Sequence, residues 1–557
     1  MKITGADIII ETLIEQGVDT VFGYPGGAVL NIYDALYKNS DRIRHVLTAH
    51  EQGAAHAADG YSRATGRVGV VIATSGPGAT NLITGIATAM LDSVPMVAIT
   101  GNVSCDLIGR DSFQEIDITG ITLPITKHNY FANDITQLSD MLREAFRIAR
   151  SGRPGPVLID VPKDVQTALF DYEPMPVAPP FPNRQAPQEQ IEAAAELLAA
   201  AERPYLYIGG GVAGAGIASE IEKMADRIDG VIGCSFMGLS AIPTDNPRFL
   251  GMQGMHGHYA SSMAQSEADL ILAVGVRFSD RATGNKQKYV RGARLIHLDV
   301  DFSELNKNIP ATLGIAGDIT DAFRRLLSAV PERRHPAWQE RIATLRAEEA
   351  AQLHESGGLT PHAVIETING IIGPQTVIAT DVGQHQMWAA QYCRFRRPRR
   401  FVSSGGLGTM GFGLGAAIGA ATGSGDRTVL ITGDGSFGMN LNEMATLASQ
   451  NLPLTVVIFN NGVLGMVRQW QTLFYGHRYS NTTLHRKTDF VRLSEAFGIP
   501  AVRVSDLASF RAAFAEAYAK DGPMLIDCAI DPDEFVLPML PPGGSIEDII
   551  LEKEEKA

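Results

Sequence analysis

Several features are scarce in this chain of 557 residues, and each scarcity argues against a class of protein. Its four cysteines, Cys105, Cys234, Cys393 and Cys528, lie far apart and form no CxxC pair. Neither a disulfide framework nor a structural zinc site is therefore indicated, and a cytoplasmic location fits. The chain also has no block of Lys or Arg, and its net charge is -14. This charge argues against nucleic acid or an anionic membrane as the main partner.

Long apolar runs are also missing. No segment has the length and purity of a membrane span, and acidic residues interrupt the apolar pattern of residues 1–17, unlike in a signal peptide. We therefore interpret residues 1–17 as a helix of the folded protein. With 45% hydrophobic and 19% charged residues, the chain is typical of a globular protein with several domains.

One pattern recurs in three parts of the chain: β-branched apolar runs of strand length that end in glycine and lead into a helical pattern. It occurs at residues 68–101, in the middle at 204–216, 268–280 and 293–301, and then at 427–440 and 454–462. Apolar strands that alternate with helices predict parallel sheets covered on both faces. The sequence thus predicts an α/β protein with three doubly wound parallel-sheet domains.

The predicted boundaries follow shifts in composition. Tyr172 to Gln190 is rich in proline and reads as an extended linker, and a charged helical stretch closed by Gly357 and Gly358 marks a second break. We predict domains at residues 1–172, 190–335 and 358–540, followed by a polar tail at 541–557. The sequence leaves open whether this tail is disordered or closes over a site.

The stretch GDGSFG places Asp434 between a strand and a helix, where parallel α/β sheets bind ligands. Glycines beside Asp434 leave backbone N–H groups free to face an anion, and its carboxylate suits magnesium. The next strand ends at Asn460 and Asn461, so it returns an amide to the same sheet edge. Each motif alone is most often a simple turn. Together, GDG and NN separated by residues 436–459 resemble the diphosphate-binding motif of thiamine diphosphate enzymes.

A second motif supports the same resemblance. In HEQGAAHAADGYSRATG, Glu51 lies between a strand and a helix rich in small residues, where another body can approach closely. Alone, an acid at a helix start more often only favours the helix dipole. Beside the GDG motif, this stretch resembles the glutamate motif of thiamine enzymes, in which the acid activates the pyrimidine of the cofactor.

The resemblance to thiamine enzymes implies magnesium bound by Asp434, Asn461 and the backbone carbonyl of Val463. It also implies that the two halves of the site meet across a subunit interface, so the expected assembly is a homodimer or homotetramer. The methionines of the implied contacts could equally be core residues. The implied thiamine diphosphate contacts are Gln384, His385, Gly408, Met410, Gly435, Ser436 and Met466.

The middle domain points to a second cofactor. Gly209, Gly211 and Gly214 form a GxGxxG pattern, but the acidic residue that NAD binding requires about 20 residues later is missing. The stretches LGMQGMHGHYA, AVGVRFSDRATG and LIHLDVD instead resemble the FAD domain of the acetohydroxyacid synthase family. Asp299, at a strand end, could also simply cap a turn. The implied FAD contacts are Arg153, Gly209, Gly210, Met255, His256, Gly275, Arg277, Asp280, Asp299 and Asp318.

This family resemblance extends over nearly the whole chain and implies an activity. Pyruvate loses carbon dioxide, and its two-carbon unit joins a second 2-oxoacid, pyruvate or 2-oxobutyrate, as the first common step of branched-chain amino-acid biosynthesis. Arg281 corresponds to the receptor for the carboxylate of the second oxoacid, which a bidentate donor suits. A small regulatory subunit is an implied partner. The implied residues around the reaction are Gly26, Glu51, Phe113, Gln114, Lys163, Arg281 and Trp470.

Three alternatives differ in what the site does. A pyruvate oxidase would share both cofactors but reduce the flavin, and a catabolic acetolactate synthase would lack FAD. A third alternative is a non-catalytic subunit with a thiamine-enzyme fold. The stretch Phe113-Gln114-Glu115, together with Arg281 and Trp470, favours the synthase over the oxidase. RFSDRATG argues against the FAD-free enzyme, and intact Glu51 and Asp434 argue against the non-catalytic subunit.

Overall fold

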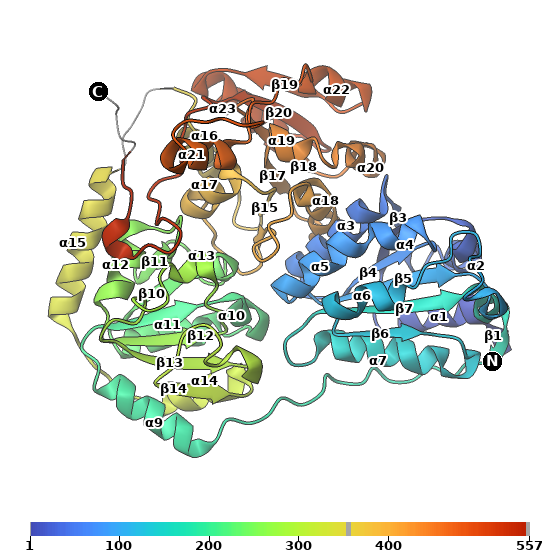
Figure 1. Cartoon of the computed structure of the whole chain (residues 1–557), viewed down its shortest axis with the longest axis horizontal. Coiled ribbons are helices and arrows are strands. Elements are labelled where there is room, and N and C mark those ends of the chain that lie inside the picture. Colours follow the sequence, from blue (N-terminus) through green and yellow to red (C-terminus); the bar gives the residue numbers. More distant parts are fainter. Residues whose placement is uncertain (1, 353–357, 553–557) are drawn as a thin grey trace.

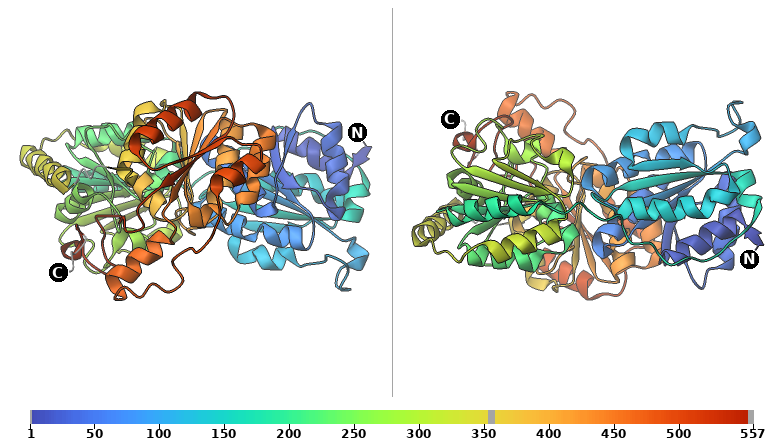
Figure 2. Two further views of the ribbon diagram at one scale, coloured as in Figure 1. Left: turned by 90° about the horizontal axis from the view of Figure 1, so that it is seen from above. Right: turned by 90° about the horizontal axis from the view of Figure 1, so that it is seen from below.

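The computed structural model describes residues 2–352 and 358–552, and it contains three six-stranded sheets whose strand pairs are all parallel. Figure 1 shows the N-terminal sheet (blue) and the middle sheet (green) side by side, with the C-terminal sheet (orange) above them. Helices cover both faces of each sheet (Figures 1 and 2). The predicted α/β class with three parallel sheets is confirmed. Gly357 and tail residues 553–557 lie outside the described residues.

The N-terminal sheet has the strand order β3-β2-β4-β5-β7-β6. Its strands are β2 (Thr20–Tyr24), β3 (Arg44–Leu47), β4 (Gly69–Ala73), β5 (Met96–Asn102), β6 (His128–Phe131) and β7 (Pro156–Pro162). The helices are α1 (Gly5–Glu15), α2 (Leu30–Lys38), α3 (Glu51–Thr65), α4 (Pro77–Asn81), α5 (Ile83–Asp92), α6 (Ile118–Thr122), α7 (Leu138–Arg150) and α8 (Lys163–Thr167). A short antiparallel pair, β1 (Lys2–Thr4) and β8 (Leu169–Asp171), joins the two ends of this unit. The N-terminal segment thus forms α1, as predicted.

The middle sheet has the order β11-β10-β9-β12-β13-β14. Its strands are β9 (Pro204–Ile208), β10 (Val231–Cys234), β11 (Phe249–Met252), β12 (Leu270–Val274), β13 (Arg294–Asp299) and β14 (Leu313–Ala316). The helices are α9 (Gln188–Ala199), α10 (Gly210–Ala215), α11 (Ala218–Arg227), α12 (Tyr259–Glu267), α13 (Asp280–Thr283), α14 (Ile319–Ala329) and α15 (Pro336–Gln352). Residues 173–187 before α9 contain neither helix nor strand and run along the outside of the molecule (Figure 1). Because α9 begins at Gln188, the extended linker is slightly shorter than predicted.

The C-terminal sheet has the order β16-β15-β17-β18-β20-β19. Its strands are β15 (Val377–Thr380), β16 (Phe401–Val402), β17 (Thr428–Gly433), β18 (Leu454–Asn460), β19 (Ala501–Val504) and β20 (Met524–Ala529). The helices are α16 (Pro361–Ile371), α17 (Gln384–Tyr392), α18 (Phe412–Ser424), α19 (Asp434–Phe437), α20 (Met444–Gln450), α21 (Gly465–Phe474), α22 (Phe490–Ala496) and α23 (Leu507–Ala519). A short 3-10 helix, η7 (Leu441–Glu443), precedes α20.

Helices α3 and α18 pack against each other and join the N-terminal and C-terminal units (Figure 1). The contact depends on small residues, because a Cβ on Gly60 would lie 2.0 Å from the backbone oxygen of Ala416, and one on Gly419 would lie 1.8 Å from that of Ala57. Real Cβ atoms do not approach backbone this closely, so the alanine and glycine content of both helices sets their separation. Helix α3, which starts at Glu51, is thereby fixed to the C-terminal unit of the same chain.

No helix among residues 2–352 and 358–552 combines the length and apolar character needed to cross a membrane.

Candidate active site

The turn after β17 carries the predicted metal ligand. Strands β17 and β18 pair with Gly433 opposite Phe459, so Asp434 and Asn460 follow at the same edge of the sheet. Asp434 is buried, and its carboxylate accepts the backbone N–H groups of Gly435 and Gly462. Burial raises the pKa of this carboxyl to about 6. A cation at the turn would compensate the desolvated charge.

The two asparagines at the end of β18 have different partners. Asn460 donates its amide to the buried carboxylate of Asp527 at 2.9 Å. Asn461 donates to Gln384 Oε1 at 3.4 Å, and its own oxygen accepts the Val463 N–H at 3.2 Å. Asn460 therefore stabilises the end of the strand, whereas Asn461 contacts the predicted diphosphate residue Gln384 and accepts the N–H of Val463.

The surroundings of the turn fit a diphosphate with magnesium. His385 is buried, which lowers its pKa to about 3, and no hydrogen-bond partner within the described chain reaches its Nε2 atom. A Cβ on Gly433 would lie 2.8 Å from the His385 ring, and one on Gly465 would lie 1.9 Å from Gln384 Oε1. Next to Asp434 is a cavity of about 430 Å³ whose lining includes Arg486 and Arg503. Oxygen ligands, a neutral ring with an unsatisfied nitrogen and nearby cations suit this group.

The remaining predicted thiamine contacts lie close to this turn. Ser436 follows in α19 and donates its hydroxyl to the backbone oxygen of Val382 at 2.6 Å. Met410 lies near Gly435, since a Cβ on Gly435 would be 4.0 Å from the Met410 Cε atom. Gly408 is exposed in a backbone conformation with φ +67°, which favours glycine. Met466 is half-buried in α21.

Glu51 is the first residue of α3. Its carboxylate accepts a hydrogen bond from the Asn81 amide at 3.0 Å, and a Cβ on Gly78 would lie 3.2 Å from it. Asn81 ends α4, which begins at Pro77 just after β4, so both side chains lie near the end of one strand. Asn81 was not predicted from the sequence; the only signal was the GPG turn that opens its helix at this edge of the sheet.

Three predicted substrate residues of the N-terminal unit are exposed or lie in strained loops. The Phe113 side chain is 87% exposed, and Lys163 is exposed at the start of α8. Gln114 has φ +59° and packs against Gly76, where a Cβ would lie 2.9 Å from the Gln114 Cα atom. Gly26 packs against Thr74, because a Cβ added at position 26 would lie 2.5 Å from the Thr74 side chain.

The structure brings two other predicted substrate residues together. The Arg281 guanidinium, from α13 of the middle unit, lies 5.4 Å from the ring centre of Trp470 in α21. No partner among residues 2–352 and 358–552 bonds to the buried Trp470 indole N–H, and Arg281 Nη1 lies 3.7 Å from the Met255 sulfur. A guanidinium that rests on an aromatic face keeps its edge available for a carboxylate.

Backbone segments approach closely at the predicted flavin site. Gly209, Gly211 and Gly275 meet where β9 and β12 end: a Cβ on Gly209 would lie 2.0 Å from the Gly275 oxygen, and Gly275 has φ +59°. His256 is buried, which lowers its pKa to about 4, and its Nδ1 atom has no partner in the described part of the chain. Gly210 lies beside Met237. A narrow glycine cradle with a neutral, unsatisfied imidazole fits a flavin nucleotide.

Charged side chains continue the predicted flavin site toward the N-terminal unit. Arg153 pairs with Glu304 at 2.8 Å and so bridges the two units. Arg277 lies 3.9 Å from Asp92, and burial lowers its pKa. Asp299 ends β13, and burial raises its pKa to about 6. Asp299 also accepts the N–H of residue 301 at 2.9 Å, so it caps a turn whatever else it binds.

Two further predicted flavin residues lie at helix starts. Asp280 is exposed as the first residue of α13. Asp318 caps α14 through the Asp321 N–H at 2.9 Å and accepts the Asn183 amide at 2.9 Å.

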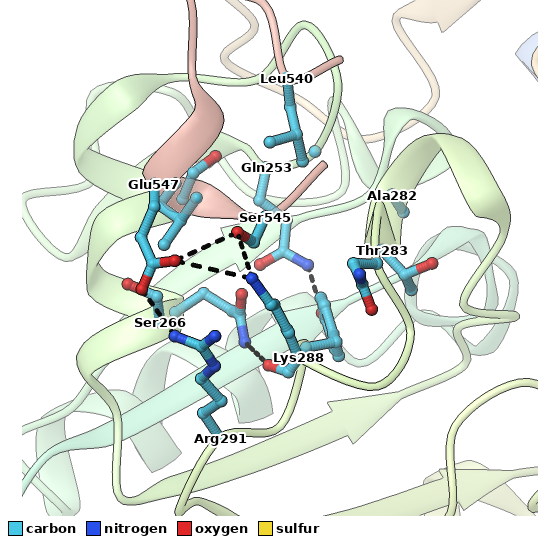
Figure 3. A pocket seen from close by; sticks show the side chains of 15 residues that line it. Gln253, Ser266, Ala282, Thr283, Lys288, Arg291, Leu540, Ser545 and Glu547 are labelled. Atoms are coloured by element: carbon cyan, nitrogen blue, oxygen red, sulfur yellow. Dashed lines mark hydrogen bonds and ion pairs between the residues drawn. The ribbon is translucent and has the colours of Figure 1, made fainter. Parts of the chain in front are cut away.

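The C-terminal segment folds back on the middle unit. Leu540 donates its N–H to the Met255 oxygen at 2.7 Å, which places the segment next to the residue that contacts Arg281. Further on, Glu547 pairs with Arg291 at 2.6 Å and lies 3.7 Å from Lys288 (Figure 3). These side chains line a cavity of about 220 Å³. The described part of the tail thus lies near Arg281.

Apart from the predicted flavin contacts, the predicted residues form two groups in one chain. The first, on the N-terminal unit, comprises Gly26, Glu51, Phe113, Gln114 and Lys163. The second surrounds the diphosphate turn and the Arg281–Trp470 pair. Residues that the sequence did not reveal support the second group: Gln469 is buried, accepts the Gln384 amide at 3.0 Å and donates to the Val536 oxygen at 3.0 Å.

Comparison with known proteins agrees with this arrangement. Three family profiles match in order along the chain: "Thiamine pyrophosphate enzyme, N-terminal TPP binding domain" at residues 3–121, "central domain" at 191–326 and "C-terminal TPP binding domain" at 381–528. The acetolactate synthase isozyme 2 large subunit of Escherichia coli (strain K12) is 45% identical, covering 98% of this chain and 99% of its own length. The acetolactate synthase large subunit of Corynebacterium glutamicum is 45% identical over 98% of this chain and 90% of its own. The probable acetolactate synthase large subunit of Methanocaldococcus jannaschii is 44% identical over 98% and 95%. The chain belongs to the acetolactate synthase large-subunit family of thiamine pyrophosphate enzymes.

Proposed function

We propose that the chain is the catalytic subunit of a biosynthetic acetolactate synthase. It converts pyruvate and a second 2-oxoacid, pyruvate or 2-oxobutyrate, into 2-acetolactate or 2-aceto-2-hydroxybutyrate with loss of carbon dioxide. The observation that carries the proposal is the Arg281–Trp470 pair, 5.4 Å apart, because it provides a receptor for the carboxylate of an acceptor acid. An oxidase that passes electrons to its flavin needs no such receptor.

Magnesium is held by Asp434, the Asn461 side chain and the Val463 carbonyl, and the cation offsets the desolvated carboxylate of Asp434. When bound, thiamine diphosphate supplies a carbon nucleophile that takes up pyruvate and allows carbon dioxide to leave. The diphosphate contacts are Gln384, His385, Gly435 and Ser436, and those nearer the pyrimidine are Gly408, Met410 and Met466.

Glu51 handles the proton that activates the cofactor. Its carboxyl lies at a helix start beside Asn81, and its Oε atom holds a proton against a nitrogen of the pyrimidine ring. Asn81 fixes one carboxylate oxygen, so that the other is directed to the ring.

Both residue groups bind the oxoacids. Arg281 takes the carboxylate of the acceptor, and the partly buried indole of Trp470 contacts its side chain, which sets the preference between a methyl and an ethyl group. Phe113, Gln114, Lys163 and Gly26 close the pocket from the side of Glu51. The exposure of Phe113 and Lys163 in a single chain supports a pocket completed by a second copy.

FAD would be held by the glycine cradle of the middle unit, formed by Gly209, Gly210 and Gly275, and Arg153 and Arg277 would supply positive charge for it. The remaining contacts are Met255, His256, Asp280, Asp299 and Asp318. FAD carries no net electrons in this reaction, so its role is to support the site. The unsatisfied Nδ1 atom of His256 supports this placement.

The family resemblance implies a site shared between subunits, and the exposed Phe113 and Lys163 support a shared site. We propose a homodimer as the smallest active unit, with a homotetramer as the larger form, and a small regulatory subunit as a partner. The domain bounds proposed from the sequence are 1–172, 190–335 and 358–540, with a tail at 541–557, and helices α9 and α15 extend the middle domain to residues 188–352. The enzyme works in the cytoplasm.

A product assay tests the function. Purified protein with pyruvate, thiamine diphosphate, magnesium and FAD is expected to form acetolactate, to lose this activity when FAD is stripped and to regain it when FAD returns. Acetate formation with flavin reduction would instead identify an oxidase. Acetolactate formation by a colourless, FAD-free protein would identify the catabolic type.

A further inference from the structure

Glu443 is a charged side chain that is fully buried although the proposed reaction gives it no role. It ends η7 of the C-terminal unit and has 0% exposure. Its two carboxylate oxygens accept the backbone N–H groups of Ala49 at 3.2 Å and His50 at 3.0 Å, and the Thr446 hydroxyl at 2.6 Å. The carboxylate thus crosses from one unit to the residues that directly precede Glu51.

Glu443 packs directly against the first turn of α3. A Cβ on Gly53, in the first turn of α3, would lie 2.0 Å from Glu443 Oε1. Glycine at position 53 is therefore needed for the carboxylate to reach the start of α3. Since Gly53 and Glu51 share the first turn of α3, the contact fixes the turn that carries the proposed proton-handling acid.

The two donors have no helical partner to replace Glu443. Residues 49 and 50 precede α3, so their N–H groups cannot bond within that helix. Instead, His50 serves as the cap and accepts the Gln52 N–H on its ring Nδ1 atom at 3.1 Å. Without the carboxylate, two backbone donors in a part-buried segment would lack a charged acceptor, and the segment before Glu51 would be free to shift.

We propose that Glu443 is a positioning residue for Glu51: by accepting the N–H groups of residues 49 and 50, it sets the place and direction from which the Glu51 carboxyl reaches the cofactor. The inference rests on the role of Glu51 in the proposed function. Displacement of a reacting group by about 1 Å lowers turnover by up to about 100-fold.

The test uses Glu443→Gln, which keeps the size of the side chain but replaces one acceptor oxygen with an NH₂ group that opposes a backbone N–H. In the cofactor-free protein, the amides of residues 49 and 50 are expected to exchange faster with deuterium. In the loaded protein, turnover and deuterium exchange at the thiazolium C2 atom of bound thiamine diphosphate are expected to fall about 10- to 100-fold. The affinity for the cofactor is expected to stay unchanged, because Glu443 touches none of its proposed contacts.

Asp506→Asn is the matched control, since Asp506 also accepts a backbone N–H at a helix start, that of Ser509 at 2.9 Å, but is exposed and caps α23. It is expected to leave C2 exchange unchanged. Gly53→Ala is the second variant: it displaces the carboxylate without altering it and is expected to slow C2 exchange in the same way.

Normal C2 exchange and normal turnover per bound cofactor in Glu443→Gln would overturn the proposal. If that variant does not fold, the same criterion applies to Gly53→Ala. Absence of acetolactate with the wild-type protein would defeat the proposed function, but the comparison of C2 exchange between wild type and variant would still decide the role of Glu443.

Discussion

A buried ion network ties α3 to the C-terminal unit, and its central cation is the subject of our most detailed prediction. Arg63 is 8% exposed at the side chain and pairs with Asp59 and with Asp92, the latter at 3.0 Å, both of which are fully buried. It also donates to the Ser403 oxygen at 2.9 Å. Asp92 in turn accepts the N–H groups of Gly405 and Gly406 at 3.0 and 2.7 Å.

Arg63→Met removes the cation and leaves two carboxylates in a dry interface. Removal of one partner from a buried ion pair typically costs about 3–5 kcal/mol, because the remaining charge loses its compensation. With about 2–4 °C per kcal/mol for units of this size, the melting temperature of the cofactor-free protein is expected to fall by about 10 °C. Differential scanning calorimetry measures this change.

The pH dependence of the stability difference between Arg63→Met and the wild type provides a second test. Burial raises the pKa of Asp59, and Arg63 opposes this effect. Without Arg63, the folded protein binds a proton that the unfolded chain releases, so its stability falls as pH rises above the unfolded pKa. The deficit of Arg63→Met relative to wild type should therefore be larger at pH 8 than at pH 5.

Arg67→Met is the control, because Arg67 lies just beyond α3 and pairs with Asp19 at a surface where both side chains are about half exposed. Such pairs contribute about 0–1 kcal/mol, so little change in melting temperature is expected. Equal melting temperatures for the two variants would refute the reasoning about the buried network.

Three further predictions concern single side chains. Burial raises the pKa of Asp160 to about 7, so between about pH 4 and 7 the folded protein binds a proton that the unfolded chain releases. The stability of the wild type therefore falls as the pH rises, and Asp160→Asn should become more stable relative to the wild type by up to about 1.4 kcal/mol per pH unit. Urea unfolding of both proteins from pH 5 to 7 measures this difference. Arg281→Lys keeps the charge but loses bidentate recognition of the acceptor carboxylate. Acetolactate formation should therefore fall about 10- to 100-fold while carbon dioxide release from pyruvate persists, and separate assays measure the two products. Equal losses in both assays would contradict an acceptor role. Arg291→Ala breaks an exposed ion pair with Glu547. Limited proteolysis should then cut the C-terminal segment faster, and the melting temperature should not change. An unchanged cleavage rate would mean that other contacts hold the segment.

The features that could be predicted from the sequence are those set by local patterns of residues. Apolar strands followed by glycine identified the three sheets, because a strand buried on both faces needs a continuous apolar run. The GDG turn and the paired asparagines were predicted to share one sheet edge, and the register of β17 and β18 confirms this. The catalytic and cofactor roles of individual residues stay predictions.

Contacts between distant parts of the chain were beyond the sequence. Glu443 lies in a stretch that is typical of an ordinary helix start. Nothing in the neighbouring sequence indicates that its carboxylate accepts the backbone N–H groups of residues 49 and 50. The resemblance named Asn461 as the metal ligand, but the partner of Asn460, Asp527, comes from β20 and was not predicted. Such roles depend on how the units pack, and periodicity carries no information about that.

The most direct test of the account is subunit complementation. Glu51→Gln and Asp434→Ala, each expected to be inactive alone, are mixed under conditions that exchange subunits, and acetolactate formation is measured. If Glu51 of one chain serves the Asp434 site of its partner, half of the dimers carry one intact site, and roughly a quarter of the wild-type activity should return. No recovery, with exchange verified by tagged chains, would contradict a site shared between two subunits.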